Sequence, residues 1–171
     1  YSFFQALVVP LLLGFANATR AGVVQSIAAL GMLASSLLLG ALLGTRHPNG
    51  LFSTGLLVTS ASIAAFGAGR ALPAAAVALV LLYAALPLVN TAAEVLLRQR
   101  IGEVAQGRNW ARIGVVTQSG YLLAYLMTGP LTDRLVGPQT MLTLTGLALF
   151  AGSLIYIVRA AQARKGTVIP C

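Results

Sequence analysis

The chain has 171 residues, of which 58% are hydrophobic and only 8% are charged, whereas soluble domains carry about 25% charged residues. This composition excludes an ordinary water-soluble domain, and the apolar runs leave no room for a soluble catalytic domain. The net charge is +8, but Lys and Arg stand between the apolar runs and form no single stripe, so we expect a lipid bilayer and no nucleic acid as the partner.

Six apolar segments follow one another along the chain, each close to the roughly 20 residues that a helix needs to cross a bilayer. We expect helices at about residues 1–18, 21–44, 51–69, 73–97, 110–131 and 139–158. The turn at Pro48-Asn49-Gly50 separates the second segment from the third, a polar loop covers residues 98–109, and a polar tail covers residues 159–171. The sequence therefore predicts an all-α, polytopic membrane protein.

The start of the chain is unusual for a complete membrane protein. Tyr1 is not an initiator Met, and the first 15 residues are already hydrophobic without the basic flank of a signal peptide. We therefore expect a fragment that begins inside a transmembrane helix.

The basic residues predict the orientation, because cytoplasmic loops are enriched in Lys and Arg. Six alternating helices place eight of the eleven basic residues on one side and three on the other. The larger group is Arg46, Arg98, Arg100, Arg108, Arg112, Arg159, Arg164 and Lys165, and the smaller is Arg20, Arg70 and Arg134. We expect an inner-membrane protein whose C-terminus and 98–109 loop are cytoplasmic.

The two halves of the sequence resemble each other weakly. Val23-Val24-Gln25-Ser26 in the second segment matches Val115-Val116-Thr117-Gln118-Ser119 in the fifth, and Pro10 has a counterpart in Pro87. Helices one to three then correspond to helices four to six, which is the pattern of the inverted three-helix repeats found in secondary transporters. Small residues at Ala28, Gly31, Ser35, Gly40 and Gly44 also predict that the second helix packs closely against another.

Ionisable residues within a bilayer are candidates for function, and the chain has three acidic residues. Glu103 falls in the predicted loop and Asp133 follows Gly129-Pro130 near a helix end, so only Glu94 lies on a helix near the bilayer. Glu94 could couple transport to protons or gate the inner mouth of a cavity. The alternative is an interfacial ion pair with Arg98, because Glu at i and Arg at i+4 is the favourable order.

Neutral polar residues on the predicted helices form a second set of candidates: Gln25, Asn90, Gln118, Tyr121 and Tyr125. Gln118, Tyr121 and Tyr125 follow three- and four-residue steps, so they share one helix face and could line a cavity. The alternative is that these side chains form hydrogen bonds between helices.

The residues needed for catalysis or metal binding are scarce. Cys171 is the only cysteine, which excludes an intramolecular disulfide and a cysteine metal cluster. His47, the only histidine, falls in a predicted loop, and no nucleophile with a general base is available inside the bundle. We expect neither an enzyme nor a cofactor.

Several motifs, in order, resemble the C-terminal half of the major facilitator exporters, in particular the branch that contains the enterobactin exporter and macrolide-efflux-type proteins. They are residues 90–100 (Asn-Thr-Ala-Ala-Glu-Val-Leu-Leu-Arg-Gln-Arg), Gln106-Gly107-Arg108 and Gly129-Pro130-Leu131-Thr132-Asp133-Arg134. The segment from Ala21 to Gly40 is similar to the second helix of that half. One departure is that Gly44 occupies the acidic position of the family's loop signature.

The resemblance implies six helices that form one half of a twelve-helix fold, with helices one, two, four and five facing a central cavity. It also implies a secondary transporter that exports a small amphiphilic, drug-like or siderophore-like compound by alternating access. The expected partners are a missing N-terminal half, the small-molecule substrate and protons as a candidate coupling ion. The alternative is a six-helix membrane module of another class, either an ABC-type membrane domain or a structural partner subunit.

Overall fold

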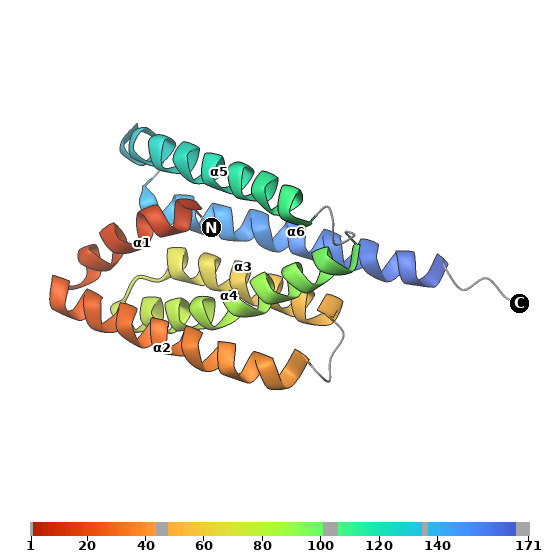
Figure 1. The fold of residues 1–171 in the computed structure, drawn as a ribbon. Helices are drawn as coiled ribbons and strands as arrows, with labels where there is room; N and C mark the ends of the chain where they lie inside the picture. Colours follow the sequence, from red (N-terminus) through yellow and green to blue (C-terminus); the bar gives the residue numbers. More distant parts are fainter. Residues whose placement is uncertain (1, 44–47, 101–105, 135–136, 167–171) are drawn as a thin grey trace, which may run out of the picture.

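The computed structural model describes residues 2–43, 48–100, 106–134 and 137–166, and these residues form six α-helices (Figure 1). In chain order the helices are α1 (Ser2–Phe15), α2 (Ala18–Leu43), α3 (Pro48–Ala68), α4 (Leu72–Arg100), α5 (Gln106–Arg134) and α6 (Pro138–Gly166). The prediction of an all-α fold is confirmed for the part of the chain that the structure describes.

The helices begin at residues that suit helix starts. Pro48 and Pro138 open α3 and α6, and Pro73 is the second residue of α4, positions where proline costs no intrahelical hydrogen bond. Asn17 caps α2, because its Oδ1 atom accepts a hydrogen bond of 3.0 Å from the backbone N–H of Arg20.

The polar segments around the helices were predicted wrongly at three ends. The predicted loop over residues 98–109 is helical at 98–100 and again from Gln106, and the predicted tail is helical as far as Gly166. These stretches consist largely of Arg, Gln and Ala, which are good helix formers. Polarity therefore marked the edge of the apolar region rather than the end of each helix.

The most closely packed helices are α3 and α4. The most extensive pairings are α3 with α4, α3 with α6, and α2 with α4, while α1 contacts α2, α4, α5 and α6. The core between them is formed by large apolar side chains, including Leu12, Ile63, Phe66, Leu79, Leu82 and Leu142. In Figure 1, α5 lies at the edge of the bundle, where α1 is its main neighbour among the described helices.

The contact between α3 and α6 depends on glycine. A Cβ atom added to Gly146 would lie 2.3 Å from the backbone nitrogen of Ala64, and one added to Gly67 would lie 2.5 Å from that of Thr143. The rings of Phe52 and Tyr156 meet edge to face further along, with centroids 5.6 Å apart. Close approach through small residues is the usual way in which helices associate in lipid.

The small residues predicted to pack along α2 do so over part of its length. Ala28 is fully buried, and a Cβ atom on Gly31 would lie 3.4 Å from the Val80 side chain of α4. Gly40 and Gly44 fall outside the residues whose packing is described. The tightest glycine contacts thus belong to α3 and α6, which the sequence pattern did not single out.

Four of the described helices are long and apolar enough to cross a membrane: Ala18–Leu39, Pro48–Ala68, Leu72–Gln99 and Pro138–Ala160. α1 has only 14 described residues, about 21 Å of helix. α5 carries Arg108, Arg112 and Gln118 and does not reach the same hydropathy. Six segments were predicted to cross the bilayer, and four meet these requirements of length and hydropathy.

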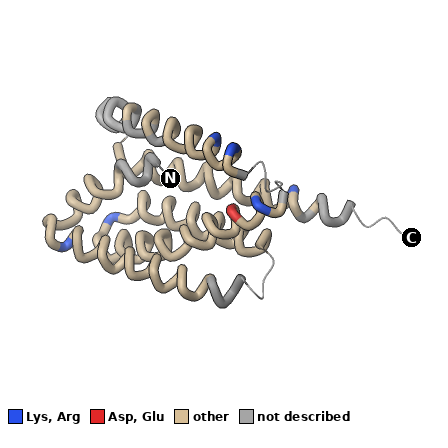
Figure 2. The backbone as a smooth tube through the Cα atoms, viewed as in Figure 1, with Lys and Arg blue, Asp and Glu red and all other residues tan. Residues whose placement is uncertain are grey.

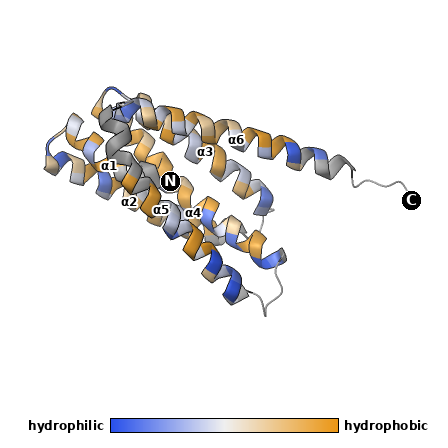
Figure 3. Cartoon of the chain, turned by 90° about the horizontal axis from the view of Figure 1, so that it is seen from above, coloured by the Kyte–Doolittle hydropathy of each residue, from blue (hydrophilic) through white to orange (hydrophobic). Residues whose placement is uncertain are grey.

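The apolar side chains of the spanning helices are largely not covered by protein. α2 and α6 are hydrophobic on all sides, yet only 17% of the membrane window of each is buried inside the bundle. Leu37 on α2 is 81% exposed and Ile155 on α6 is 57% exposed. Figure 3 shows hydrophobic residues along the helices and hydrophilic ones mainly towards their ends. A surface of this kind needs lipid around it, so the chain is a membrane protein.

Candidate functional site

A groove between α4 and α5 brings polar and aromatic side chains together. Its volume is about 450 Å³, and it is lined by Asn90, Ala93, Glu94, Leu97, Trp110 and Ile113. The first four share one face of α4, because they follow each other at steps of three, one and three residues. Trp110 and Ile113 come from the first two turns of α5. The groove is therefore built where the end of one helix meets the beginning of the next.

Glu94 carries the one acidic side chain that the structure describes, and it pairs with Arg98 one turn further along α4. The Arg98 Nη2 atom lies 2.5 Å from the Glu94 Oε1 atom. The i to i+4 ion pair expected from the sequence is therefore present. Both side chains are accessible, at 41% for Glu94 and 60% for Arg98, so the pair contributes only about 0.2 to 0.5 kcal/mol. A ligand could displace Arg98 at little cost.

The end of the bundle that holds this groove is basic. Arg98 lies in the last turn of α4, and Arg108 and Arg112 lie in the first two turns of α5. Figure 2 shows Lys and Arg gathered towards the two ends of the bundle, with the acidic residue close to the end that has more of them. One carboxylate thus stands among several cations.

The structure brings together only some of the residues that the sequence suggested. Asn90 is exposed and Glu94 half-buried in the same groove, whereas Gln25 is half-buried on α2 and Gln118 is exposed on α5, and neither lines it. Gly107 and Arg108 are exposed at the start of α5. Tyr121, Tyr125, Gly129, Pro130 and Asp133 belong to the helical part of α5, but their side chains fall outside the described part of the structure.

Trp110 is the residue that sequence reasoning missed. It begins the predicted helix over residues 110–131 and is not among the candidate site residues, although it is the single Trp of the chain and lines the groove. A Trp at the boundary between a polar stretch and an apolar helix is typical of a membrane interface, and that signal could have identified it.

Metal binding has no support in the side chains that are described. No three residues of the types His, Cys, Asp or Glu lie close enough together there to hold an ion. The groove instead offers an amide, a carboxylate, an indole ring and alkyl groups, a combination that suits a small molecule with polar and apolar parts.

Comparisons of the chain with protein families, with curated proteins and with solved structures found no match.

Proposed function

We propose that this chain forms one half of a secondary active transporter of the major-facilitator type, built from two inverted repeats, α1–α3 and α4–α6. In this proposal a second six-helix half supplies the opposite wall of the cavity. The transporter exports a small amphiphilic, drug-like or siderophore-like compound by alternating access, with protons as the candidate coupling ion.

The observation that carries the proposal is the pairing of the helices. If α1, α2 and α3 are exchanged for α4, α5 and α6, the α2–α4 contact becomes α5–α1 and the α3–α4 contact becomes α6–α1. The α3–α6 and α1–α4 contacts are unchanged by the exchange. All of these pairs are in contact, although the α1–α5 and α1–α6 contacts are smaller than their counterparts α2–α4 and α3–α4, and the small α1–α2 contact lacks a counterpart of similar size. An inverted repeat produces such a pattern, since each half presents the same faces to the other.

The sequence correspondences support the same exchange. Pro10 lies inside α1 and Pro87 lies inside α4, the two helices that the exchange relates. Gln25 and Gln118 lie on α2 and α5, the second related pair. Transporters of this class often build their binding sites beside interrupted helices, and the groove described above lies along α4, the helix that contains Pro87.

The groove between α4 and α5 gives the proposal its candidate site. Asn90 can donate and accept hydrogen bonds, Trp110 offers an aromatic face, and Glu94 is an ionisable group near the bilayer. Because the Glu94–Arg98 pair is weak, protonation of the carboxylate or binding of a ligand could release Arg98. Such an exchange would link occupancy of the groove to movement of the helix end.

The coding DNA upstream of Tyr1 tests the proposal. It should encode six further hydrophobic helices of about 20 residues each, in the same reading frame. A start codon directly upstream would contradict the proposal and would favour a self-contained six-helix module, such as an ABC-type membrane domain or a partner subunit.

A further inference from the structure

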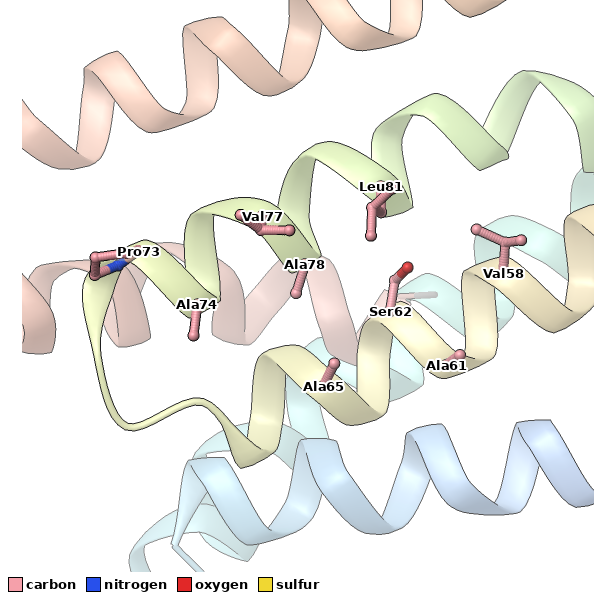
Figure 4. A pocket seen from close by; sticks show the side chains of 9 residues that line it. All are labelled: Val58, Ala61, Ser62, Ala65, Pro73, Ala74, Val77, Ala78 and Leu81. Atoms are coloured by element: carbon pink, nitrogen blue, oxygen red, sulfur yellow. The ribbon is translucent and has the colours of Figure 1, made fainter.

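A second groove lies between α3 and α4, away from the site described above (Figure 4). Its volume is about 640 Å³, and the residues that line it are Val58, Ala61, Ser62, Ala65, Pro73, Ala74, Val77, Ala78 and Leu81. Figure 4 shows Ala65 of α3 and Ala74 of α4 facing each other across it. The groove exists because small side chains stand opposite one another on two helices that otherwise pack closely.

The groove opens sideways onto the surface of two spanning helices. Ala65, Ala74 and Val77 are exposed along its rim, whereas Ser62 and Ala78 are each only 4% exposed on its floor. Both α3 and α4 are long and apolar enough to cross the membrane. The medium that meets this opening is therefore the hydrocarbon of the bilayer, and an occupant enters from lipid.

The depth of the groove matches one leaflet. From Pro73 to Leu81 it follows eight residues of α4, about 12 Å of helix, and half of a hydrocarbon core of about 30 Å is about 15 Å. In Figure 4 the end at Pro73 lies beside the connection between α3 and α4. A lipid acyl chain that starts at the membrane surface would thus run inward along the groove.

A cation stands at the surface end of the groove. Arg70 is exposed in the short connection between Ala68 and Leu72, three residues before Pro73. A basic residue at this level attracts the phosphate of an anionic phospholipid and is worth about 1 kcal/mol. The groove and the cation together supply a place for an acyl chain and a place for its headgroup.

Ser62 is the only polar side chain that lines the groove. Its hydroxyl points into the space (Figure 4) and forms no hydrogen bond within the described structure. Other helical serines, such as Ser60 and Ser153, donate to a carbonyl one turn earlier in their own helix. Ser62 can turn to the corresponding carbonyl of Val58 when an alkyl chain fills the groove, so the hydroxyl does not oppose an apolar occupant.

We propose that this groove is a binding site for an anionic phospholipid, with one acyl chain between α3 and α4 and the phosphate at Arg70. Binding gains little from the hydrophobic effect, because the surrounding lipid is equally apolar. Packing contacts and the headgroup charge hold the lipid instead. The proposal requires only that the chain lies in a membrane and does not depend on transport.

Lipid retention by the purified chain tests the proposal. Native mass spectrometry would count the phospholipids that remain after mild detergent extraction, and phosphatidylglycerol and phosphatidylcholine would then be added back. The wild-type chain should retain one lipid and prefer phosphatidylglycerol by about fivefold, the ratio that 1 kcal/mol gives.

Two variants distinguish the contribution of the acyl chain to lipid binding from that of the headgroup. The double variant Ala65→Leu/Ala74→Leu fills the groove and should lose the retained lipid, while Ala29→Leu, which enlarges one alanine on the exposed face of α2, should keep it. Arg70→Gln should retain a lipid without the preference for phosphatidylglycerol. Circular dichroism would show that each variant is helical.

The proposal is overturned if a helical double variant retains the lipid as the wild type does, if Arg70→Gln keeps the full preference for phosphatidylglycerol, or if Ser62→Ala alone abolishes binding.

Discussion

Gly146 of α6 lies so close to Ala64 of α3 that a Cβ atom at position 146 would stand 2.3 Å from the backbone nitrogen and 2.6 Å from the Cα atom of Ala64. Neither of these backbone atoms can move without displacing its helix. The close approach fixes α3 against α6, the one extensive pairing that the exchange of repeats leaves unchanged.

Replacing Gly146 with alanine should therefore destabilise the bundle. The added methyl group overpacks the α3–α6 interface, and such changes cost about 1–3 kcal/mol. The measurement is the free energy of unfolding of the purified chain in mixed micelles, titrated with a denaturing detergent.

Gly152→Ala is the matched control on the same helix, because nothing lies within 4 Å of a Cβ atom built there. Alanine is favoured over glycine in a helix by roughly 0.5–1 kcal/mol, so this variant should be as stable as the wild type or slightly more so. Equal stability of Gly146→Ala and Gly152→Ala would contradict the glycine-dependent contact.

The ion pair between Glu94 and Arg98 should contribute little to stability. Both side chains are accessible, and an exposed i to i+4 pair is worth about 0.2 to 0.5 kcal/mol. The Arg98→Gln variant should therefore unfold within about 0.5 kcal/mol of the wild type in the same titration. A loss of several kcal/mol would mean that the pair is structural, and the proposal that Arg98 is readily released would fail.

Trp110 provides a direct signal for binding in the α4–α5 groove, because it is the only Trp in the chain and lines that groove. An amphiphilic dye such as rhodamine 6G should quench its fluorescence in a saturable way. Ala93→Leu places extra carbon atoms in the groove and should weaken binding by about tenfold, or about 1.4 kcal/mol.

The control for this titration is Ala29→Leu, which enlarges an exposed alanine on α2 that does not line the groove. It should bind the dye as the wild type does. Quenching that is linear in dye concentration, or that Ala93→Leu leaves unchanged, would show that the dye partitions into the micelle and that the groove does not bind it.

The two ends of the bundle should face opposite sides of the membrane. In a chain with Cys171→Ser, a cysteine placed at Ala71, next to Arg70, should react with an impermeant maleimide added outside cells. A cysteine placed at Gln99, next to Arg98, should react only after the cells are opened. This result follows from the excess of basic residues on the cytoplasmic side. Labelling of Gln99→Cys in intact cells would reverse the proposed orientation.

The six helices could be predicted from the sequence because each contains an apolar run bounded by polar residues, a local property of composition, although only four of the described helices are long and apolar enough to cross a membrane. Their ends could not, since residues 98–100 and 159–166 are polar yet have high helix propensity. Glu94 and Arg98 were paired correctly because their spacing on one helix fixes their distance. The contacts of Gly67 and Gly146 were not foreseen, because they join helices far apart in the sequence and no local spacing encodes that partnership. Trp110 was missed although its position between a polar stretch and an apolar helix is typical of a membrane interface; the groove that it lines exists only when α5 meets α4.

The central claim is that this bundle works as half of a proton-coupled exporter, and transport measures it most directly. Inverted membrane vesicles that contain the complete transporter should accumulate rhodamine 6G when a proton gradient is imposed, and Glu94→Gln at equal membrane levels should abolish the dependence on the gradient. Vesicles that contain residues 1–171 alone should not transport. Gradient-driven accumulation by this chain on its own, or no accumulation by the complete protein, would contradict the account.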